Sequence, residues 1–131
     1  MKFSILTVSP CRPEEVHFDL LLLTDGKGHE VSWSLKVTER DNIMLSGSGY
    51  SSYSQNNVVE CIPLDCYTFL ITDSNGDGLC CDYGYGEYSI RLNGLKLASG
   101  SSYGFQDEVD LRCLLVPTMP PTHEVRFIMI L

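Results

Sequence analysis

The segment 73–78, DSNGDG, carries oxygen-bearing side chains at alternate positions, which is the chemistry of a cation-binding loop. Asp73, Asn75 and Asp77 fit the D-x-N-x-D-G pattern that turns successive oxygens toward one calcium ion. The loop is not an EF-hand, because its twelfth position, where a bidentate acid would stand, is Gly84. Calcium takes about six to eight oxygens, so other parts of the chain must contribute. The sequence predicts a calcium site with the ligand set Asp73, Asn75, Asp77, Asp82, Glu87 and Asp25.

Two alternatives to this site stay open. Asp, Asn and Gly are ordinary turn residues, so one alternative is a tight turn with solvated acids. Against it, Asp73, Asp77 and Asp82 would repel one another at close range without a cation. Magnesium is the weaker metal candidate, because it prefers to retain waters. The chain contains an internal repeat, and the loop in its first copy, where only Asp25 and Glu30 are acidic, is a weaker candidate for a separate calcium site.

No catalytic motif accompanies the loop. The chain has no H-E-x-x-H pair and no phosphate loop, and acids such as Glu60 and Glu87 could be paired in any acidic protein. We therefore expect no enzyme. Tyrosines in Gly/Ser-rich loops suit stacking on sugar rings, which makes a calcium-dependent carbohydrate-binding or adhesion module the alternative function. These tyrosines are Tyr50, Tyr53, Tyr83, Tyr85, Tyr88 and Tyr103.

The six cysteines are even in number and match no zinc pattern, since CxxC is absent and the three histidines are scattered. We expect all six to be oxidised, which implies secretion to an extracellular or cell-surface location. Cys80 and Cys81 are neighbours that are hard to join to each other, so separate partners are expected. The start, MKFSILTVSP, lacks a full signal peptide, which predicts a leader already removed or an added methionine.

The elements that must position these residues are strands. The 131 residues are 44% hydrophobic and 20% charged, as in one globular domain, and the net charge of -8 argues against nucleic acid and anionic lipid as partners. No apolar run reaches the ~20 residues of a membrane-spanning helix. Short alternating or β-branched runs predict an all-β fold, an antiparallel two-sheet, jelly-roll-like sandwich. The runs are 16–25, 31–37, 66–73, 88–94, 95–99 and 109–116.

Two local features sharpen this fold prediction. Asn93-Gly94 between alternating runs is typical of a two-residue hairpin with positive φ, and Trp33, in an alternating strand, is expected in the core. The chain also repeats itself in order, residues 22–35 matching 70–92 and residues 46–61 matching 98–113. In this alignment Asp25 corresponds to Asp73, and Glu30 to Glu87. The repeat predicts an internal duplication of two four-strand halves.

The segments LLTDGKGHEVSWSLK and CYTFLITDSNGDGLCCDYGYGEYSIRLNG resemble a β-sandwich module of secreted and surface proteins of bacteria and marine algae. The family is marked by T-D-x-x-x-x-E-x-S-W, C-Y-x-F-x-I-x-D-S-x-G-D-G-x-C-C and G-x-G-x-Y, and the resemblance covers about residues 16–113. It implies a sandwich fold and no single activity. It also implies that four cysteines pair among themselves and pin the acidic loop, which leaves Cys11 with Cys113. The four are Cys61, Cys66, Cys80 and Cys81.

The end of the chain indicates a function. We expect a domain over 1–115, a proline-rich linker over 116–122 and a terminal strand over 123–131 with one apolar face, formed by Val125, Phe127, Met129 and Leu131. Exposed, such a strand is an aggregation hazard, and one alternative is an edge strand of its own sandwich. The tail resembles the donated strand of filament subunits. The sequence thus predicts a structural subunit of an extracellular filament or surface fibre, a head-to-tail homopolymer of identical chains.

Overall fold

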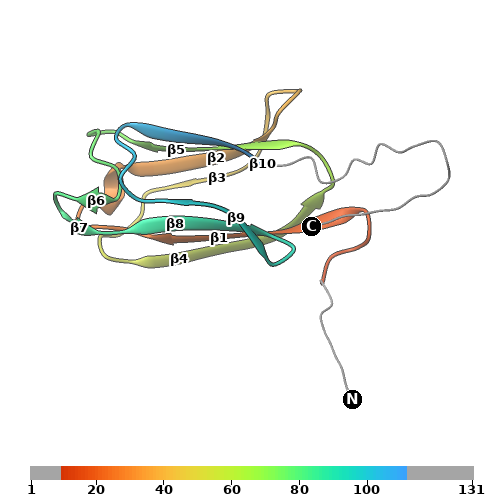
Figure 1. The fold of residues 1–131 in the computed structure, drawn as a ribbon, viewed down its shortest axis with the longest axis horizontal. Coiled ribbons are helices and arrows are strands. Elements are labelled where there is room, and N and C mark those ends of the chain that lie inside the picture. Colours follow the sequence, from red (N-terminus) through yellow and green to blue (C-terminus); the bar gives the residue numbers. More distant parts are fainter. Residues whose placement is uncertain (1–9, 112–131) are drawn as a thin grey trace, which may run out of the picture.

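The computed structural model describes residues 10–111, which fold into two antiparallel four-stranded sheets packed face to face (Figure 1). The elements are β1 (Glu15–Leu23), η1 (Gly28–Glu30), β2 (Val31–Val37), β3 (Asn42–Ser48), β4 (Gln55–Pro63), β5 (Tyr67–Asp73), β6 (Cys80–Cys81), β7 (Gly84–Tyr85), β8 (Glu87–Leu92), β9 (Leu95–Gly100) and β10 (Gln106–Leu111). One sheet has the order β4-β1-β8-β9 and the other β10-β5-β2-β3, while β6 and β7 form a short ribbon. The predicted antiparallel sandwich is confirmed.

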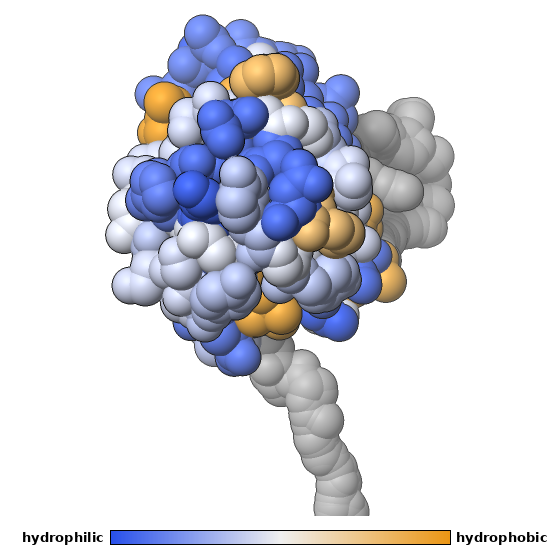
Figure 2. Space-filling view, turned by 90° about the vertical axis from the view of Figure 1, so that its left-hand side faces the viewer, coloured by the Kyte–Doolittle hydropathy of each residue, from blue (hydrophilic) through white to orange (hydrophobic). Residues whose placement is uncertain are grey.

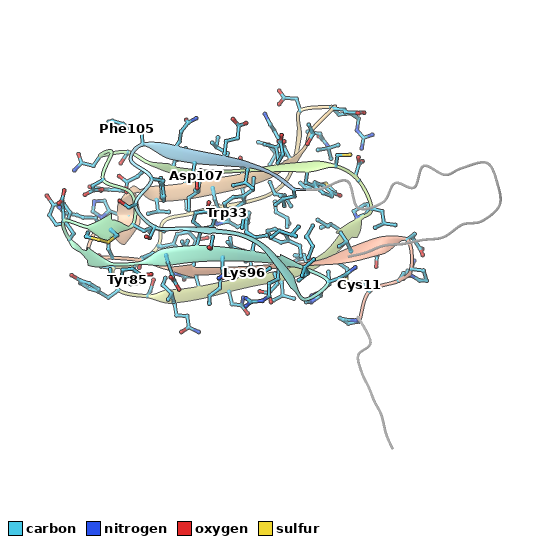
Figure 3. The ribbon with its side chains drawn as sticks, viewed as in Figure 1. Cys11, Trp33, Tyr85, Lys96, Phe105 and Asp107 are labelled. Atoms are coloured by element: carbon cyan, nitrogen blue, oxygen red, sulfur yellow. A yellow bond between two sulfur atoms is a disulfide. The ribbon has the colours of Figure 1, made fainter. Side chains whose placement is uncertain are left out.

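The core lies between the inner faces of the two sheets. In β1 and β2 every second side chain is buried, so the alternation in the sequence defines the inner face. Trp33 is 4% exposed and stands between the layers, as Figure 3 shows, and its Nε1 donates to the Tyr50 hydroxyl at 2.7 Å. It belongs to a row of aromatic rings, Phe18, Trp33, Phe69 and Tyr88, whose neighbouring centroids lie 5.4–6.3 Å apart. The prediction that Trp33 is a core residue is confirmed.

The strand order supports the internal duplication. The duplication matches β1 with β5, β2 with β8, β3 with β9 and β4 with β10. When each strand is exchanged for its match, the order β4-β1-β8-β9 becomes β10-β5-β2-β3, which is the order of the other sheet. Each half therefore contributes two strands to each sheet. The two halves are related by a pseudo-twofold exchange of sheets, so corresponding loops lie at the same end of the sandwich.

The predicted hairpin joins β8 to β9. Asn93 and Gly94 both have positive φ, 49° and 83°, as a two-residue turn of this type requires. The Asn93 side chain also accepts a hydrogen bond from the His17 backbone N–H at 2.9 Å, which ties the turn to β1. This turn lies at the end of the sandwich away from the ribbon of β6 and β7 (Figure 1).

The loops that matter for function gather at the ribbon end. β1 and β5 finish there and β2, β4, β8 and β10 begin there, as their registers show. Residues 24–30, 49–54, 74–86 and 101–105 therefore share this end (Figure 1). The part of the chain that the structure describes contains no helix long and apolar enough to cross a membrane. The expected linker over 116–122 and strand over 123–131 lie outside the described residues.

Candidate metal centre

Three carboxylates from two segments of the chain converge at the ribbon end. Glu30, Asp73 and Asp77 each offer an oxygen, and these oxygens all lie within 4.8 Å of one another. Asp73 is 1% exposed, and the Glu30 side chain is 10% exposed. Two oxygens that each lie about 2.4 Å from one cation are at most ~4.8 Å apart, so the spacing fits a shared calcium ion.

Four carboxylate oxygens of this cluster are buried without a hydrogen-bond partner. They are Glu30 Oε1, Asp73 Oδ2, Asp77 Oδ1 and Asp77 Oδ2. A buried carboxylate oxygen without a partner is costly, because it has lost water and gained nothing in exchange. A divalent cation shared by the three carboxylates would relieve this cost, since hard cations take carboxylate oxygens as ligands.

Strand register explains why Glu30 reaches the loop. β2 and β5 are antiparallel neighbours, and Val31 at the start of β2 pairs with Asp73 at the end of β5. Glu30 is the last residue of η1, directly before that pair. The backbone N–H of Ser74 donates to the Glu30 carbonyl at 3.0 Å, which fixes the two segments together.

The loop after β5 is folded around Asp73. Asp73 Oδ1 accepts hydrogen bonds from the backbone N–H groups of Asn75 at 2.9 Å and Gly76 at 3.0 Å. Gly76 and Gly78 have φ of 81° and 64°, a region that glycine enters without steric cost. These bends turn Asp77 back toward Asp73, while Asp73 Oδ2 stays available for a ligand.

Electrostatics at the cluster favour a bound cation. Burial raises the pKa of Asp73 to about 6, and the charges of Asp77 and Glu30 add to this, although the Asn75 N–H acts in the opposite direction. Among the described residues, the ion pairs are Lys36–Asp41, Arg40–Asp65 and a 4.0 Å contact between His29 and Glu30, so no lysine or arginine neutralises the cluster. The carboxylates repel one another unless a proton or a metal intervenes.

The structure brings only two of the six predicted ligand residues into the cluster. Asp73 and Asp77 lie in the cluster, and Asn75 supplies its N–H to Asp73 while its side chain is exposed. The remaining three predicted ligands, Asp25, Asp82 and Glu87, lie outside the group.

Those three acids have other surroundings. Asp25 is buried and accepts the Lys27 N–H, Asp82 is exposed, and Glu87 accepts the Tyr85 hydroxyl. Glu30 was assigned by the sequence to the first-copy loop; the antiparallel pairing of β2 with β5 is the signal that places it beside Asp73.

The disulfide pairing implied by the resemblance is wrong. Cys11 pairs with Cys61, with an S–S distance of 2.04 Å, and not with Cys113, because β1 and β4 pair so that Cys61 lies opposite His17, near the start of β1. Cys80 and Cys81 pair with each other, against the expectation of separate partners, and the peptide bond between them is cis. No cysteine in the described part of the chain is free, and Cys66 is also disulfide-bonded.

The loop is therefore stapled locally. Cys80 and Cys81 form β6, which pairs with β7. Before it, Leu79 is fully buried, donates its N–H to the Ser101 carbonyl at 2.7 Å and accepts the Gly86 N–H at 2.7 Å. The buried leucine and the disulfide hold the segment that carries Asp77 without a bridge to the neighbouring strand.

The loop tyrosines divide into two groups. Tyr53, Tyr83 and Tyr85 are exposed, by 70%, 41% and 61%, whereas Tyr88 is buried and Tyr50 and Tyr103 are half-buried against the core. Figure 2 looks onto this end and shows a mostly polar surface with separate apolar spots. Two of the exposed tyrosines already have contacts within the protein. The Tyr53 hydroxyl donates to the Tyr83 carbonyl at 3.0 Å, and Lys27 Nζ lies 4.6 Å from the centre of the Tyr83 ring.

Comparison of the chain with protein-family models, with curated proteins and with solved structures returns no match. The resemblance to the secreted sandwich module stays a prediction from the sequence.

Proposed function

We propose that the protein is a secreted structural subunit whose sandwich is completed by one calcium ion bound to Glu30, Asp73 and Asp77. The observation that carries the calcium proposal is the set of four buried carboxylate oxygens without partners, drawn from two segments that only the fold brings together. The ion would join η1 to the loop after β5. The disulfides support an oxidising, extracellular location.

Assembly would occur by strand donation, with residues 123–131 of one copy adding to a sheet edge of the next. The donated segment lies outside the described residues, so the support for this step comes from its apolar alternation and from the edges. Both sheets of the described sandwich are open, with β4, β9, β10 and β3 as edge strands. An open edge presents unpaired backbone N–H and C=O groups to a further strand.

The four edges differ in how well they are protected. β3 and β9 have register shifts in their pairing, and β10 carries three acids, Asp107, Glu108 and Asp110. β4 pairs with β1 over nine residues without irregularity, and Gln55–Val59 has no charged side chain. Bulges and charges are the usual protection against edge pairing, so β4 is the best acceptor for the donated strand.

The test is electron microscopy of the purified full chain, with calcium and with chelator, beside a variant that lacks residues 123–131. The full chain should form filaments with calcium, and the truncated chain should stay a folded, disulfide-bonded monomer. Val59→Lys on β4 should block assembly, whereas the matched change Leu95→Lys on β9 should not, since the two side chains are equally exposed. A full chain that stays monomeric at high concentration would refute the filament proposal, and truncation that unfolds the chain would place the tail in its own sandwich.

A calcium-dependent carbohydrate-binding or adhesion module is the second candidate. One observation favours it: Tyr53, Tyr83 and Tyr85 expose aromatic surface at the end that holds the carboxylate cluster. Aromatic rings with polar tips suit the faces of sugars. Affinity electrophoresis against immobilised polysaccharides, with and without calcium, separates the two candidates, because a filament subunit should not be retarded and a lectin should be retarded only with calcium.

A further inference from the structure

The loop over 101–105 forms a second wall around the carboxylate cluster. The Asp73 N–H donates to the Phe105 carbonyl at 2.8 Å, and the Leu79 N–H donates to the Ser101 carbonyl at 2.7 Å. Both ends of the segment that carries Asp77 are thus attached to this loop. Figure 3 places Phe105 at the same end of the sandwich.

Two glycines allow the wall to approach this closely. A Cβ on Gly76 would lie 2.5 Å from the Phe105 ring, and a Cβ on Gly78 would lie 2.9 Å from the Tyr103 backbone nitrogen. Such distances exclude a side chain without movement of the neighbour. The loop over 101–105 is therefore packed directly against the segment after β5 that carries Asp77.

Tyr103 in this wall has a buried hydroxyl without a hydrogen-bond partner. Its ring meets the Tyr88 ring edge to face, at 6.3 Å between centroids. Burial raises the pKa of the Tyr103 hydroxyl, and among the charges that act on it Asp73 has the largest effect. The hydroxyl is therefore neutral, and the Tyr103 backbone lies beside Gly78, directly after Asp77.

The neighbouring polar groups already have partners. The Tyr88 hydroxyl donates to Asp107 Oδ2, and Asp25 Oδ1 accepts the Lys27 N–H at 2.9 Å. In contrast, the Tyr103 hydroxyl and the oxygens of Asp73 and Asp77 that face the cluster are all without partners. An unpartnered hydroxyl and unpartnered carboxylate oxygens thus occur in two loops that pack directly against each other, which points to a common ligand.

We propose that the Tyr103 hydroxyl oxygen accepts a hydrogen bond from a water molecule bound to the calcium ion. This rests on the proposed calcium site. Calcium takes about six to eight oxygens, so the four unpartnered carboxylate oxygens leave coordination positions for water. A calcium-bound water directs its lone pair at the ion and its hydrogens outward, so it needs an acceptor nearby. Tyr103 is then a positioning residue of the metal site, and it does not touch the ion.

The proposal predicts opposite effects of one substitution on the two states of the protein. Tyr103→Phe removes the acceptor of the bound water, and loss of such an outer partner weakens metal binding about 10-fold or more. The same change removes a buried hydroxyl without a partner, so the metal-free protein should be as stable as the wild type or more stable. A residue that only fills space would not separate the two effects in this way.

The test is a calorimetric titration of calcium into the metal-free full chain, with melting temperatures of the metal-free proteins. Tyr85→Phe is the matched control, because Tyr85 is exposed at the same end and its hydroxyl already binds Glu87. Terbium, with excitation of tyrosine, adds a second readout, since sensitised emission falls steeply with distance. Tyr103→Phe should lower that emission far more than Tyr85→Phe.

The outcomes separate this proposal from the calcium site itself. Weaker calcium binding in Tyr103→Phe, with an unchanged control and no loss of metal-free stability, supports the role. Wild-type affinity in Tyr103→Phe overturns it and leaves the calcium site intact. A fall in metal-free stability that accounts for the weaker binding also overturns it. A wild type that binds no calcium overturns both.

Discussion

Glu30→Gln should stabilise the metal-free protein and weaken its response to calcium. The substitution keeps the shape of the side chain and removes one negative charge from a cluster whose oxygens lie within 4.8 Å of one another. At that separation and an effective dielectric constant of about 20, each pair of carboxylates repels by about 3 kcal/mol. The gain in unfolding free energy without metal is then about 1–3 kcal/mol, because Asp73 can take up a proton and part of the repulsion is already relieved.

With calcium bound, the effect of Glu30→Gln on the free energy of unfolding has the opposite sign. Affinity in calcium sites depends on the number of charged ligands, and loss of one of three carboxylates should weaken binding about 100-fold. At saturating calcium this removes about 2.7 kcal/mol of the stabilisation that the ion provides. For a domain of this size, that is a calcium-induced rise in melting temperature smaller by about 10 °C.

The assay is thermal unfolding by circular dichroism of the wild type, Glu30→Gln and the control Glu39→Gln, each without metal and with calcium. Glu39 is exposed in the turn between β2 and β3, at the opposite end of the sandwich, and should behave as the wild type. If Glu30→Gln melts like the control in both conditions, Glu30 is not a ligand and the reasoning from strand register is refuted.

Three further predictions follow from the loops and turns. The metal-free protein should lose stability as the pH rises from about 4 to above 6. The reason is that the pKa of Asp73 is raised to about 6 in the folded state, so the folded protein holds this proton to a higher pH than the unfolded chain does. The midpoints of urea unfolding should show this loss in the wild type and not in Asp73→Asn. Proteolytic mapping without reductant should find Cys80 joined to Cys81 and Cys11 to Cys61, and a fragment that links Cys61 to Cys80 or Cys81 would contradict the structure. Asn93→Ala should cost about 1–2 kcal/mol of unfolding free energy, because alanine disfavours φ of 49° and cannot accept the His17 N–H, while Asn93→Gly should cost less.

The features that the sequence predicts correctly depend on local pattern. Alternation fixes the inner face of β1 and β2, and Asn93-Gly94 fixes the hairpin because few residues accept positive φ. The repeat predicts the two halves, and the strand order agrees with it. β3 and β4 are both missing from the predicted runs, because polar residues interrupt the apolar alternation in Asn42–Ser48 and Gln55–Pro63.

The features that the sequence does not predict depend on which strands are neighbours. Glu30 joins Asp73 because β2 pairs with β5, a contact between residues 43 positions apart that no local motif encodes. Cys11 meets Cys61 through the pairing of β1 with β4 for the same reason. The proximity of Asp73 and Asp77 is predicted by spacing alone, since both belong to one loop whose glycines determine its shape.

The central claim is that Glu30, Asp73 and Asp77 hold one calcium ion. It is tested most directly by calorimetric titration of calcium into the metal-free full chain and into the double variant Asp73→Asn/Asp77→Asn. We expect one ion per chain with a Kd at or below about 1 mM in the wild type, which is the range of extracellular calcium modules, and no binding in the double variant. A wild type that binds no calcium at millimolar concentration, or a double variant that binds as the wild type does, would contradict the claim.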